Sequence, residues 1–292
     1  MPSIKDLKSR ITSVKNTQQT TKAMKMVSAA KLRRATDAIL SQRPYAQEIA
    51  RMMKILADPH RAALDGGGQH PVSLLLVFSS DRGLCGAYNG SVTRAALGYL
   101  AEKKRQGRQV KVIFVGKKAM ELIKSRTAVE QVHYEEFGAK VTFRRASDLS
   151  KRAIEIYHRG EVDEIAVIYN EFKNAISQEV KTQTIFPLHA EGDANEAALV
   201  EAPTDLAIYE PSKPELYEAL SAKYFVVQIF KAYLEAQASE HGARMSAMEN
   251  ATRNAGDMIR RLTLQYNKQR QAAITKELLE IIAGSESQKV QA

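Results

Sequence analysis

The stretch SSDRGLCGAYNGS, residues 79–91, has the residue types and spacing best suited to chemistry. It lies between an apolar run and a helix-like segment, which is where doubly wound sheets bind phosphates or place nucleophiles. Its glycines match neither the dinucleotide-binding nor the P-loop spacing, and GLCGA lacks the second glycine of a nucleophile elbow. A Cys85 nucleophile would also need a positioned histidine, and the sequence identifies none. The pattern favours a tight structural turn, while a catalytic thiol and a bound phosphate stay open.

Other candidate chemical groups are scattered along the chain. GKKAMELIKSR, residues 116–126, is more typical of a strand-to-helix cap than of an anion site. The six histidines have no metal-ligand spacing, so we expect no zinc site, and we expect no cofactor. Cys85 is the only cysteine, which excludes an internal disulfide and is compatible with a reducing compartment.

The composition is that of a globular protein, with 44% hydrophobic and 26% charged residues among 292. No leader or apolar run of membrane-spanning length is evident, so we expect a cytoplasmic or peripheral protein. The charge is uneven, because residues 1–57 hold twelve Lys and Arg against three Asp and Glu, which is +9 of the net +10. Such a basic segment indicates nucleic acid, anionic lipid or an acidic protein as partner, or simply a solvated helix face.

The first segment has the pattern of a long helix. Ser3 is a suitable N-cap, and Asp6 completes an approximate capping box. A heptad register starting at Ile4 gives apolar seam positions at both ends and a polar centre from Gln18 to Ser28. The a positions are 4, 11, 18, 25, 32, 39, 46 and 53, and the d positions are 7, 14, 21, 28, 35, 42, 49 and 56.

The last segment repeats this pattern from Ser212 to Ala283, with a first-turn proline at Pro214 and a natural stop at Gly284. Two such helices at opposite ends of a chain are most simply paired antiparallel, as one coiled coil. Pro44, Gly242 and Gly256 are possible breaks, which leaves open an ordinary bundle of shorter helices.

The middle of the chain alternates between two patterns. Short β-branched runs at 70–80, 110–116, 163–172 and 179–188 indicate strands, and the stretches 91–105, 117–126 and 147–159 indicate helices. This alternation predicts βαβ units on a largely parallel sheet.

The predicted fold class is therefore mixed α and β: a long antiparallel two-helix coiled coil formed by the N- and C-terminal segments, with an inserted Rossmann-like α/β domain. The expected divisions are a coiled-coil helix at 1–57, an α/β domain at 70–205, a coiled-coil helix at 210–284 and a disordered tail at 285–292.

Three stretches together resemble the gamma subunit of the bacterial rotary ATP synthase. They are the opening IKDLKSRITSVKNTQQTTKAMKMVSAAKLRRA, the turn SSDRGLCGAYN, and the closing SEHGARMSAMENATRNAGDMIRRLTLQYNKQRQAAITKELLEIIAG. The resemblance implies a central rotor shaft that couples proton-driven rotation of a membrane ring to ATP synthesis or hydrolysis at surrounding beta subunits. It also implies a non-catalytic subunit of a complex peripheral on the cytoplasmic face of the cell inner membrane.

The same resemblance implies particular partners and contacts. The partners are three alpha and three beta subunits, the epsilon subunit and the membrane ring of c subunits. Near or at the catalytic ring lie Met24, Lys25, Arg244, Arg253, Asn254, Arg270, Gln271, Thr275, Glu277, Leu278, Ile281 and Ile282. Tyr209 and Glu210 match the foot near the rotor ring and epsilon.

The length difference between the two helices bears on the apolar C-terminal end, RQAAITKELLEII. If the helices pair antiparallel, the last helix exceeds the first by about 17 residues, or roughly 25 Å. The overhang is expected from near Tyr266, where only a surrounding collar of apolar residues could cover it.

Two rival functions stay open from the residues alone. A nucleic-acid-binding arm would explain the basic first segment, but it predicts aromatic residues among the basic ones, and only Tyr45 is present there. A coiled-coil-bearing α/β enzyme would explain the middle domain, but it requires a converging catalytic site.

Overall fold

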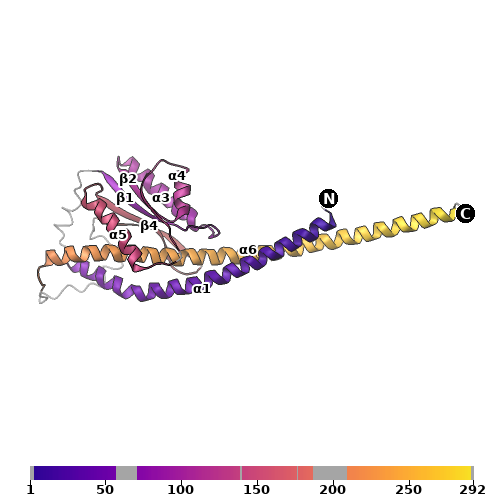
Figure 1. The fold of residues 1–292 in the computed structure, drawn as a ribbon, viewed down its shortest axis with the longest axis horizontal. Helices are drawn as coiled ribbons and strands as arrows, with labels where there is room; N and C mark the ends of the chain where they lie inside the picture. The colour runs from indigo at the N-terminus through magenta and orange to yellow at the C-terminus, as the bar shows by residue number, and fades with distance from the viewer. Residues whose placement is uncertain (1–2, 57–70, 139, 176, 187–208, 291–292) are drawn as a thin grey trace. The chain divides into compact units, whose positions relative to one another are not determined.

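Two long helices and a five-stranded α/β domain make up the chain (Figure 1). The structure is a computed structural model that describes residues 3–56, 71–138, 140–175, 177–186 and 209–290. It divides into two compact units, Met1–Val27 with Met245–Ala292, and Ser28–Arg244. The expected boundaries at 57, 70 and 205 lie outside the described residues.

Helix α1 runs from Ile4 to Leu56, and its start is the predicted capping box. Ser3 Oγ accepts from the Asp6 N–H, and Asp6 Oδ2 accepts from the Ser3 N–H, both at 3.1 Å. None of the sixteen predicted seam positions is exposed, so the heptad register is confirmed. Pro44 does not break the helix, because it lies on the exposed face where water can satisfy the backbone group it leaves unpaired.

Helix α6 runs from Lys213 to Val290. Its first turn contains Pro214, and the Ser212 hydroxyl accepts from the Glu215 N–H at 3.4 Å, as an N-cap does. The helix passes Gly284, so the predicted stop there is wrong. A glycine in a helix costs only about 1 kcal/mol, which the helical residues after it can offset.

Gly242 and Gly256 do not break α6 either; each allows close approach of another element. A Cβ on Gly242 would lie 3.3 Å from the Ala175 carbonyl oxygen, and one on Gly256 would lie 3.1 Å from Gln18 Nε2. The glycines are therefore packing positions within an unbroken helix, and the alternative of shorter bundled helices is wrong.

The sheet has strand order β3-β2-β1-β4-β5. Four strands are parallel, and β5 pairs antiparallel with β4. The strands are β1 Val72–Phe78, β2 Gln109–Val115, β3 Glu130–Glu135, β4 Glu164–Phe172 and β5 Gln178–Phe186. The sequence predicted four of these and missed β3, whose EQVHYE is polar because it is an edge strand.

Two apolar layers cover the sheet, one on each face. Helices α3 (Tyr88–Arg105) and α4 (Lys117–Lys124) pack on one face, where Leu75, Val77 and Ile168 are fully buried. The other face packs against α5 (Phe143–His158) and α6, through side chains that include Tyr233. The terminal helix α6 is thus part of the α/β core.

Candidate functional site

The glycine-rich turn after β1 is closed by its own side chains. The Ser80 N–H donates to Asn89 Oδ1 at 3.1 Å, and Asn89 Nδ2 donates to Cys85 Sγ at 3.1 Å. The Cys85 side chain is buried, and among the described residues no histidine is hydrogen-bonded to it. A buried thiol without an adjacent base is not an activated nucleophile, which favours the structural turn.

The position where α4 could hold an anion is occupied by a carboxylate of the chain itself. Asp81 Oδ1 accepts from the Lys117 N–H at 3.2 Å, and Asp81 Oδ2 accepts from the Gly138 N–H at 2.9 Å. Gly116 has a φ of 97°, and a Cβ there would lie 2.0 Å from the Ser79 carbonyl oxygen. The next two N–H groups of α4 donate to Ser80 and Ser79, so the donors that a phosphate would use already have acceptors in the chain. This segment is therefore the predicted strand-to-helix cap.

Arg244 of α6 holds the tip of the same turn. Its guanidinium lies 2.6 Å from Glu240 Oε1 and donates to the carbonyl oxygens of Arg82 and Gly83 at 3.4 and 3.3 Å. Leu84, next along the turn, has a φ of 64° and a side chain that is 64% exposed. The structure thus directs Arg244 toward its own chain, whereas the resemblance places it near the catalytic ring.

The polar centre of the seam is a row of cross-helix contacts between α1 and α6. The Thr21 and Thr252 hydroxyls are 2.8 Å apart, Gln18 Nε2 donates to the Thr252 carbonyl oxygen at 3.4 Å, and Lys25 Nζ lies 2.8 Å from Glu249 Oε1. These pairs set the antiparallel register. Polar pairs at seam positions specify register at some cost in stability.

Several predicted contact residues lie near this row of polar contacts, which we call the polar belt. Met24 is half-buried, and Arg253 and Asn254 are exposed one turn beyond Glu249 on α6. The Arg253 guanidinium reaches only Asn250 Oδ1, at 3.3 Å, among the described residues. The belt thus brings Met24 and Lys25 together with Arg253 and Asn254 on one short length of the coiled coil.

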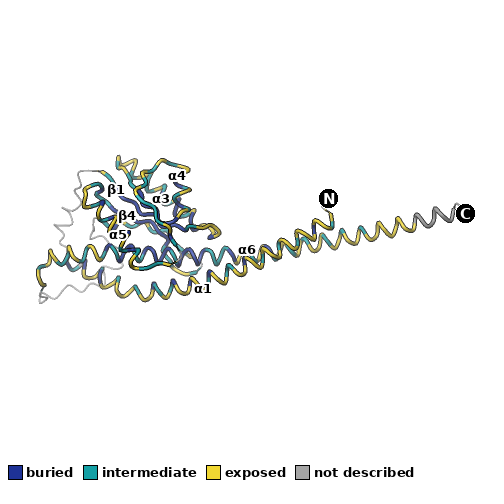
Figure 2. Tube along the Cα trace, viewed as in Figure 1, coloured by how far each residue is buried: buried dark blue, intermediate teal, exposed yellow. Residues whose placement is uncertain are grey.

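The C-terminal part of α6 is exposed on every side. Tyr266, Gln269 and Ala273 are half-buried, and every residue from 274 to 282 is exposed (Figure 2). The uncovered end therefore begins a few residues beyond the predicted Tyr266. It holds the predicted contacts Thr275, Glu277, Leu278, Ile281 and Ile282, with Arg270 and Gln271 exposed at its start.

The apolar side chains of this end are unusually open to solvent. Leu278 is 54% exposed, Ile281 68% and Ile282 56%. With Leu279, which is 61% exposed, four large aliphatic side chains are open within five residues. Leu278, Ile281 and Ile282 share one face of the helix by their i, i+3, i+4 spacing, and exposed apolar surface of this kind marks an interaction site.

Tyr209 and Glu210 lie just before α6, in the other unit. Lys213 Nζ sits 4.7 Å from the centre of the Tyr209 ring, and the Glu210 side chain is exposed. These two residues are neighbours of the α6 N-terminus and make no hydrogen bond to the turn after β1.

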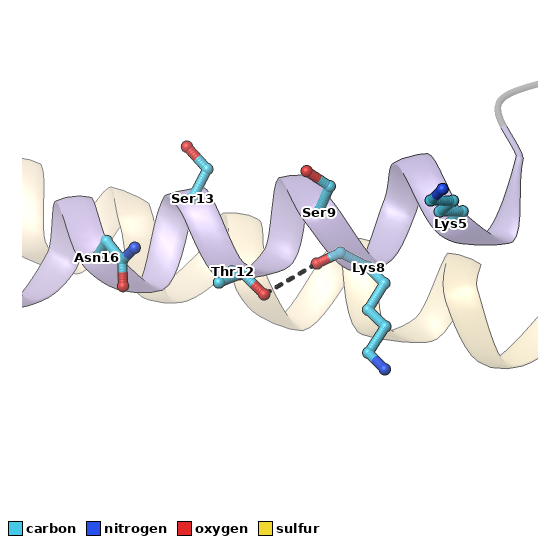
Figure 3. A pocket seen from close by; sticks show the side chains of 6 residues that line it. All are labelled: Lys5, Lys8, Ser9, Thr12, Ser13 and Asn16. Carbon is cyan, nitrogen blue, oxygen red and sulfur yellow. Dashed lines mark hydrogen bonds between the residues drawn. The ribbon is translucent and has the colours of Figure 1, made fainter.

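One hollow of the described surface lies on α1 alone. It follows the outer face of α1 and is lined by Lys5, Lys8, Ser9, Thr12, Ser13 and Asn16 (Figure 3). The Thr12 hydroxyl donates to the Lys8 carbonyl oxygen at 3.1 Å, as in any helix. Side chains from a single helix face do not enclose a small molecule, so this hollow is no active site.

Other classes of site are missing from the described residues. No cluster of three His, Cys, Asp or Glu side chains in this part of the chain could hold a metal ion. Within the same ranges, no helix is both long and apolar enough to cross a membrane.

Sequence reasoning missed the side chains by which α6 binds the sheet. Glu235, Ser239 and Tyr88 are buried and hydrogen-bonded between these elements. Residues 232–243 are buried on nearly every side, with only Gln237 half-buried. The available signal was the run of small residues in this part of α6, which permits close approach all round the helix.

Comparison with known proteins gives a consistent result over the whole chain. The family profile described as ATP synthase matches residues 3–287. The ATP synthase gamma chain of Geobacter metallireducens is 44% identical over 292 residues, which cover 99% of this chain and all of that one. The ATP synthase gamma chain of Rhizobium johnstonii is 46% identical over 302 residues, with coverage of 98% and 100%.

Solved structures give the same fold. A chain from the central stalk and c-ring of the Tetrahymena thermophila mitochondrial ATP synthase is 26% identical, with a TM-score of 0.59 over 79% of this chain and 98% of that one. A chain from the Euglena gracilis mitochondrial ATP synthase, in an OSCP/F1/c-ring structure, has a TM-score of 0.69 at 21% identity. It covers 97% of this chain and 94% of its own length.

Proposed function

The chain belongs to the ATP synthase gamma-chain family, the rotor of the central stalk, and from this premise we propose how its parts perform that task. The chain is a non-catalytic subunit, and the chemistry of ATP belongs to its partners. The observation that supports a mechanical role most directly is the α1–α6 coiled coil, whose apolar C-terminal end has no cover within the described residues.

The partners proposed for the shaft are three alpha and three beta subunits, with epsilon and the ring of c subunits at the other end. The Tetrahymena relative comes from a central stalk and c-ring, and the Euglena relative from an OSCP/F1/c-ring assembly. We place the whole complex at the cytoplasmic face of the cell inner membrane.

The uncovered end of α6 acts as a bearing surface in this proposal. Leu278, Ile281 and Ile282 are each more than half exposed, and burying them in an apolar collar would remove that surface from water. Apolar contact is non-directional, so the tip can turn inside the collar without breaking directional bonds.

The polar belt is the proposed contact with acidic loops of the beta subunits. Met24, Lys25, Arg253 and Asn254 share one short length of the coiled coil, within the part of the chain where positive charge is concentrated on α1. The ammonium of Lys25 already pairs with the half-exposed Glu249. It can exchange this carboxylate for one on a beta-subunit loop, because an exposed ion pair is weak.

A second set of ring contacts is proposed nearer the tip. Arg270, Gln271, Thr275 and Glu277 are all exposed on α6 and offer charged or hydrogen-bonding groups. Arg244 is proposed as an indirect contact: it fixes the turn that displays the exposed Leu84, and its own side chain is only 13% exposed.

Tyr209 and Glu210 are the proposed contacts with epsilon and the rotor ring. The ammonium of Lys213 lies over the Tyr209 ring, and the adjacent Glu210 is exposed, so both residues could meet a partner from one side of the α6 N-terminus.

The experiment is reconstitution with alpha and beta subunits of the same organism. We expect a complex of three alpha, three beta and one copy of this chain, in which a probe on the chain rotates when ATP is added. The isolated chain is expected to hydrolyse no ATP. A chain that stays monomeric, or that hydrolyses ATP alone, would contradict the proposal.

A further inference from the structure

The crevice where a doubly wound sheet binds its ligand is filled here by a helix. Such crevices form outside the carboxyl ends of the strands, at the point where the strand order reverses. In the order β3-β2-β1-β4-β5 that point lies between β1 and β4. Tyr233 of α6 packs edge-on against Phe78, the last residue of β1, with ring centres 4.8 Å apart.

Polar side chains of α6 bind the backbone at the end of β4. Ser239 Oγ donates to the Asn170 carbonyl oxygen at 2.9 Å, and Glu235 Oε2 accepts from the Phe172 N–H at 2.7 Å. A ligand in this crevice would use the same kind of backbone groups. Here they are satisfied by the helix.

The turn after β1 binds the same stretch of α6 from the other side of the crevice. The Tyr88 hydroxyl donates to the Ala236 carbonyl oxygen at 3.1 Å, and Asn170 Nδ2 donates to the Tyr88 carbonyl oxygen at 3.3 Å. Strand β4, helix α3 and helix α6 are therefore linked by one buried hydrogen-bonded chain.

Small residues bring these groups close together. Ser239 is fully buried, and Ala232 and Ala236 are at most 1% exposed against the sheet. Gly242 lets α6 approach the loop at Ala175 so closely that a Cβ would lie 3.3 Å from its carbonyl oxygen.

Glu235 is the most informative residue of this contact. It is 5% exposed, and burying a carboxylate is unfavourable, so packing alone would be served better by an apolar side chain. The carboxylate adds a directional contact. Apolar surfaces resist separation but can slide or twist past one another, whereas a hydrogen bond is lost when its two groups slide or twist apart.

We propose that residues 232–244 of α6 form a torsional joint, in which Glu235 and Ser239 lock the α/β sheet to the shaft so that both turn as one rigid body. The inference rests on the proposed function, because only a rotor must pass torque between these two elements. The crevice that holds a ligand in other doubly wound sheets thereby serves as a mechanical coupling.

Three variants separate the joint from general stability. The double variant Glu235→Ala/Ser239→Ala removes both bonds to β4, and Glu235→Gln keeps an acceptor for the Phe172 N–H. The matched control is Val92→Ala, which removes fully buried volume on the opposite face of the sheet. All are made in the full chain and assembled with alpha and beta subunits.

The first measurement is the angular variance of a bead on single complexes stalled in the ADP-inhibited state. One set of complexes is labelled at Lys104→Cys on α3 and a second at Lys223→Cys on α6, both exposed positions, and Cys85 stays buried and unlabelled. In the double variant we expect variance at the α3 label to rise about twofold, as local opening becomes more frequent. The α6 label should be unchanged.

The second measurement is amide hydrogen exchange at Phe172, the donor to Glu235. We expect exchange to accelerate about tenfold in the double variant, equivalent to about 1.4 kcal/mol. Glu235→Gln and Val92→Ala should resemble the unmodified chain in both measurements.

The proposal would be overturned if the double variant rotated with unchanged variance at the α3 label. It would also be overturned if Val92→Ala raised that variance by the same amount. If the double variant does not assemble, Ser239→Ala alone is measured in the same way, with the same decisive outcomes. Failure of the proposed function is distinguishable, because the α3 label on the unmodified chain would then not rotate with ATP at all.

Discussion

Cys85 packs inside the turn after β1, where its hydrogen-bond partners among the described residues are Ser80, Asn89 and the Arg82 carbonyl oxygen, none of them a base. Its sulfur accepts from Asn89 Nδ2 at 3.1 Å and lies 3.7 Å from Ser80 Oγ. We expect Cys85→Ser to retain assembly and ATP turnover and to lower stability by about 1 kcal/mol, because a hydroxyl in this buried site is less favourable than a thiol. Thermal unfolding and steady-state hydrolysis by the complex check this, and loss of turnover in a correctly assembled complex would restore the catalytic interpretation.

His241 makes stability depend on pH. Burial, with Arg244 and Lys31 nearby, lowers the pKa of its imidazole from 6.5 to about 4, and no partner for Nδ1 is found among the described residues. The unfolded chain therefore binds more protons between pH 4 and 6.5, so stability falls as pH drops through that window. The loss from this group can reach about 3 kcal/mol.

Replacing the imidazole should remove that component. We expect His241→Gln to unfold in urea with a smaller stability difference between pH 7.5 and pH 5 than the unmodified chain shows. His158→Gln, at an exposed position on α5, controls for loss of an imidazole in general. Parallel pH profiles for His241→Gln and the unmodified chain would show that His241 does not titrate in this way.

Two glycines of α6 are expected to respond differently to one substitution. Ala in a helix is more favourable than Gly by about 1 kcal/mol, and Gly256→Ala should gain most of it. Among the described residues the atom within 4 Å of the new Cβ is the Gln18 amide nitrogen, at the end of a side chain that can shift by a few tenths of an ångström. At Gly242 the neighbour is the Ala175 backbone, so Gly242→Ala should gain nothing or lose stability. Denaturant titration of the two variants tests this, and equal gains would contradict it.

How much of each element could be predicted depended on what its residues contact. The α1 seam was readable because one partner covers one face, so burial follows a seven-residue repeat from Leu7 to Leu56. A seam pattern explained only part of the burial of α6. Its second partner, the sheet, is distant in sequence and contacts the faces of the helix between the seam positions. The seam spacing of α6 therefore gives no reason to single out Ser239 or Glu235.

The candidate site shows the same division. The turn after β1 was identified from its glycines, and its structural character from the missing motif spacing. Its actual occupants, Asp81 at the α4 N-terminus and Arg244 at the turn tip, could not be predicted, since both depend on packing between separate elements. The exposure of Leu278, Ile281 and Ile282 followed from the lengths of the two paired helices, because the longer helix must extend beyond the end of the shorter one.

For the molecule as a whole, the tip and the charged turns should contribute separately to function. Deleting Glu277–Ala292 removes the exposed apolar surface of Leu278, Ile281 and Ile282 and leaves the paired part of the coiled coil intact. The ring should lose a bearing contact, so we expect weaker assembly and lower thermal stability of the complex, with turnover per assembled complex largely kept. The measurement is ATP hydrolysis normalised to assembled complex.

Charge reversal should have the opposite effect, and Arg270 is the better position for it. The Arg244 guanidinium now pairs with Glu240 at 2.6 Å, so Arg244→Glu would replace this pair by two neighbouring carboxylates and disturb the chain itself. Arg270 is exposed and has no such neighbour in the described structure. A carboxylate brought against acidic loops can cost several kcal/mol. Arg270→Glu should therefore assemble but couple poorly, with ATP-driven proton pumping reduced more than hydrolysis, and Arg270→Gln should lie between it and the unmodified chain. A truncated complex that assembled normally yet hydrolysed no ATP would show that the apolar tip is more than a bearing surface. If Arg270→Glu altered neither ATP hydrolysis nor proton pumping, the charged turns would not transmit the drive.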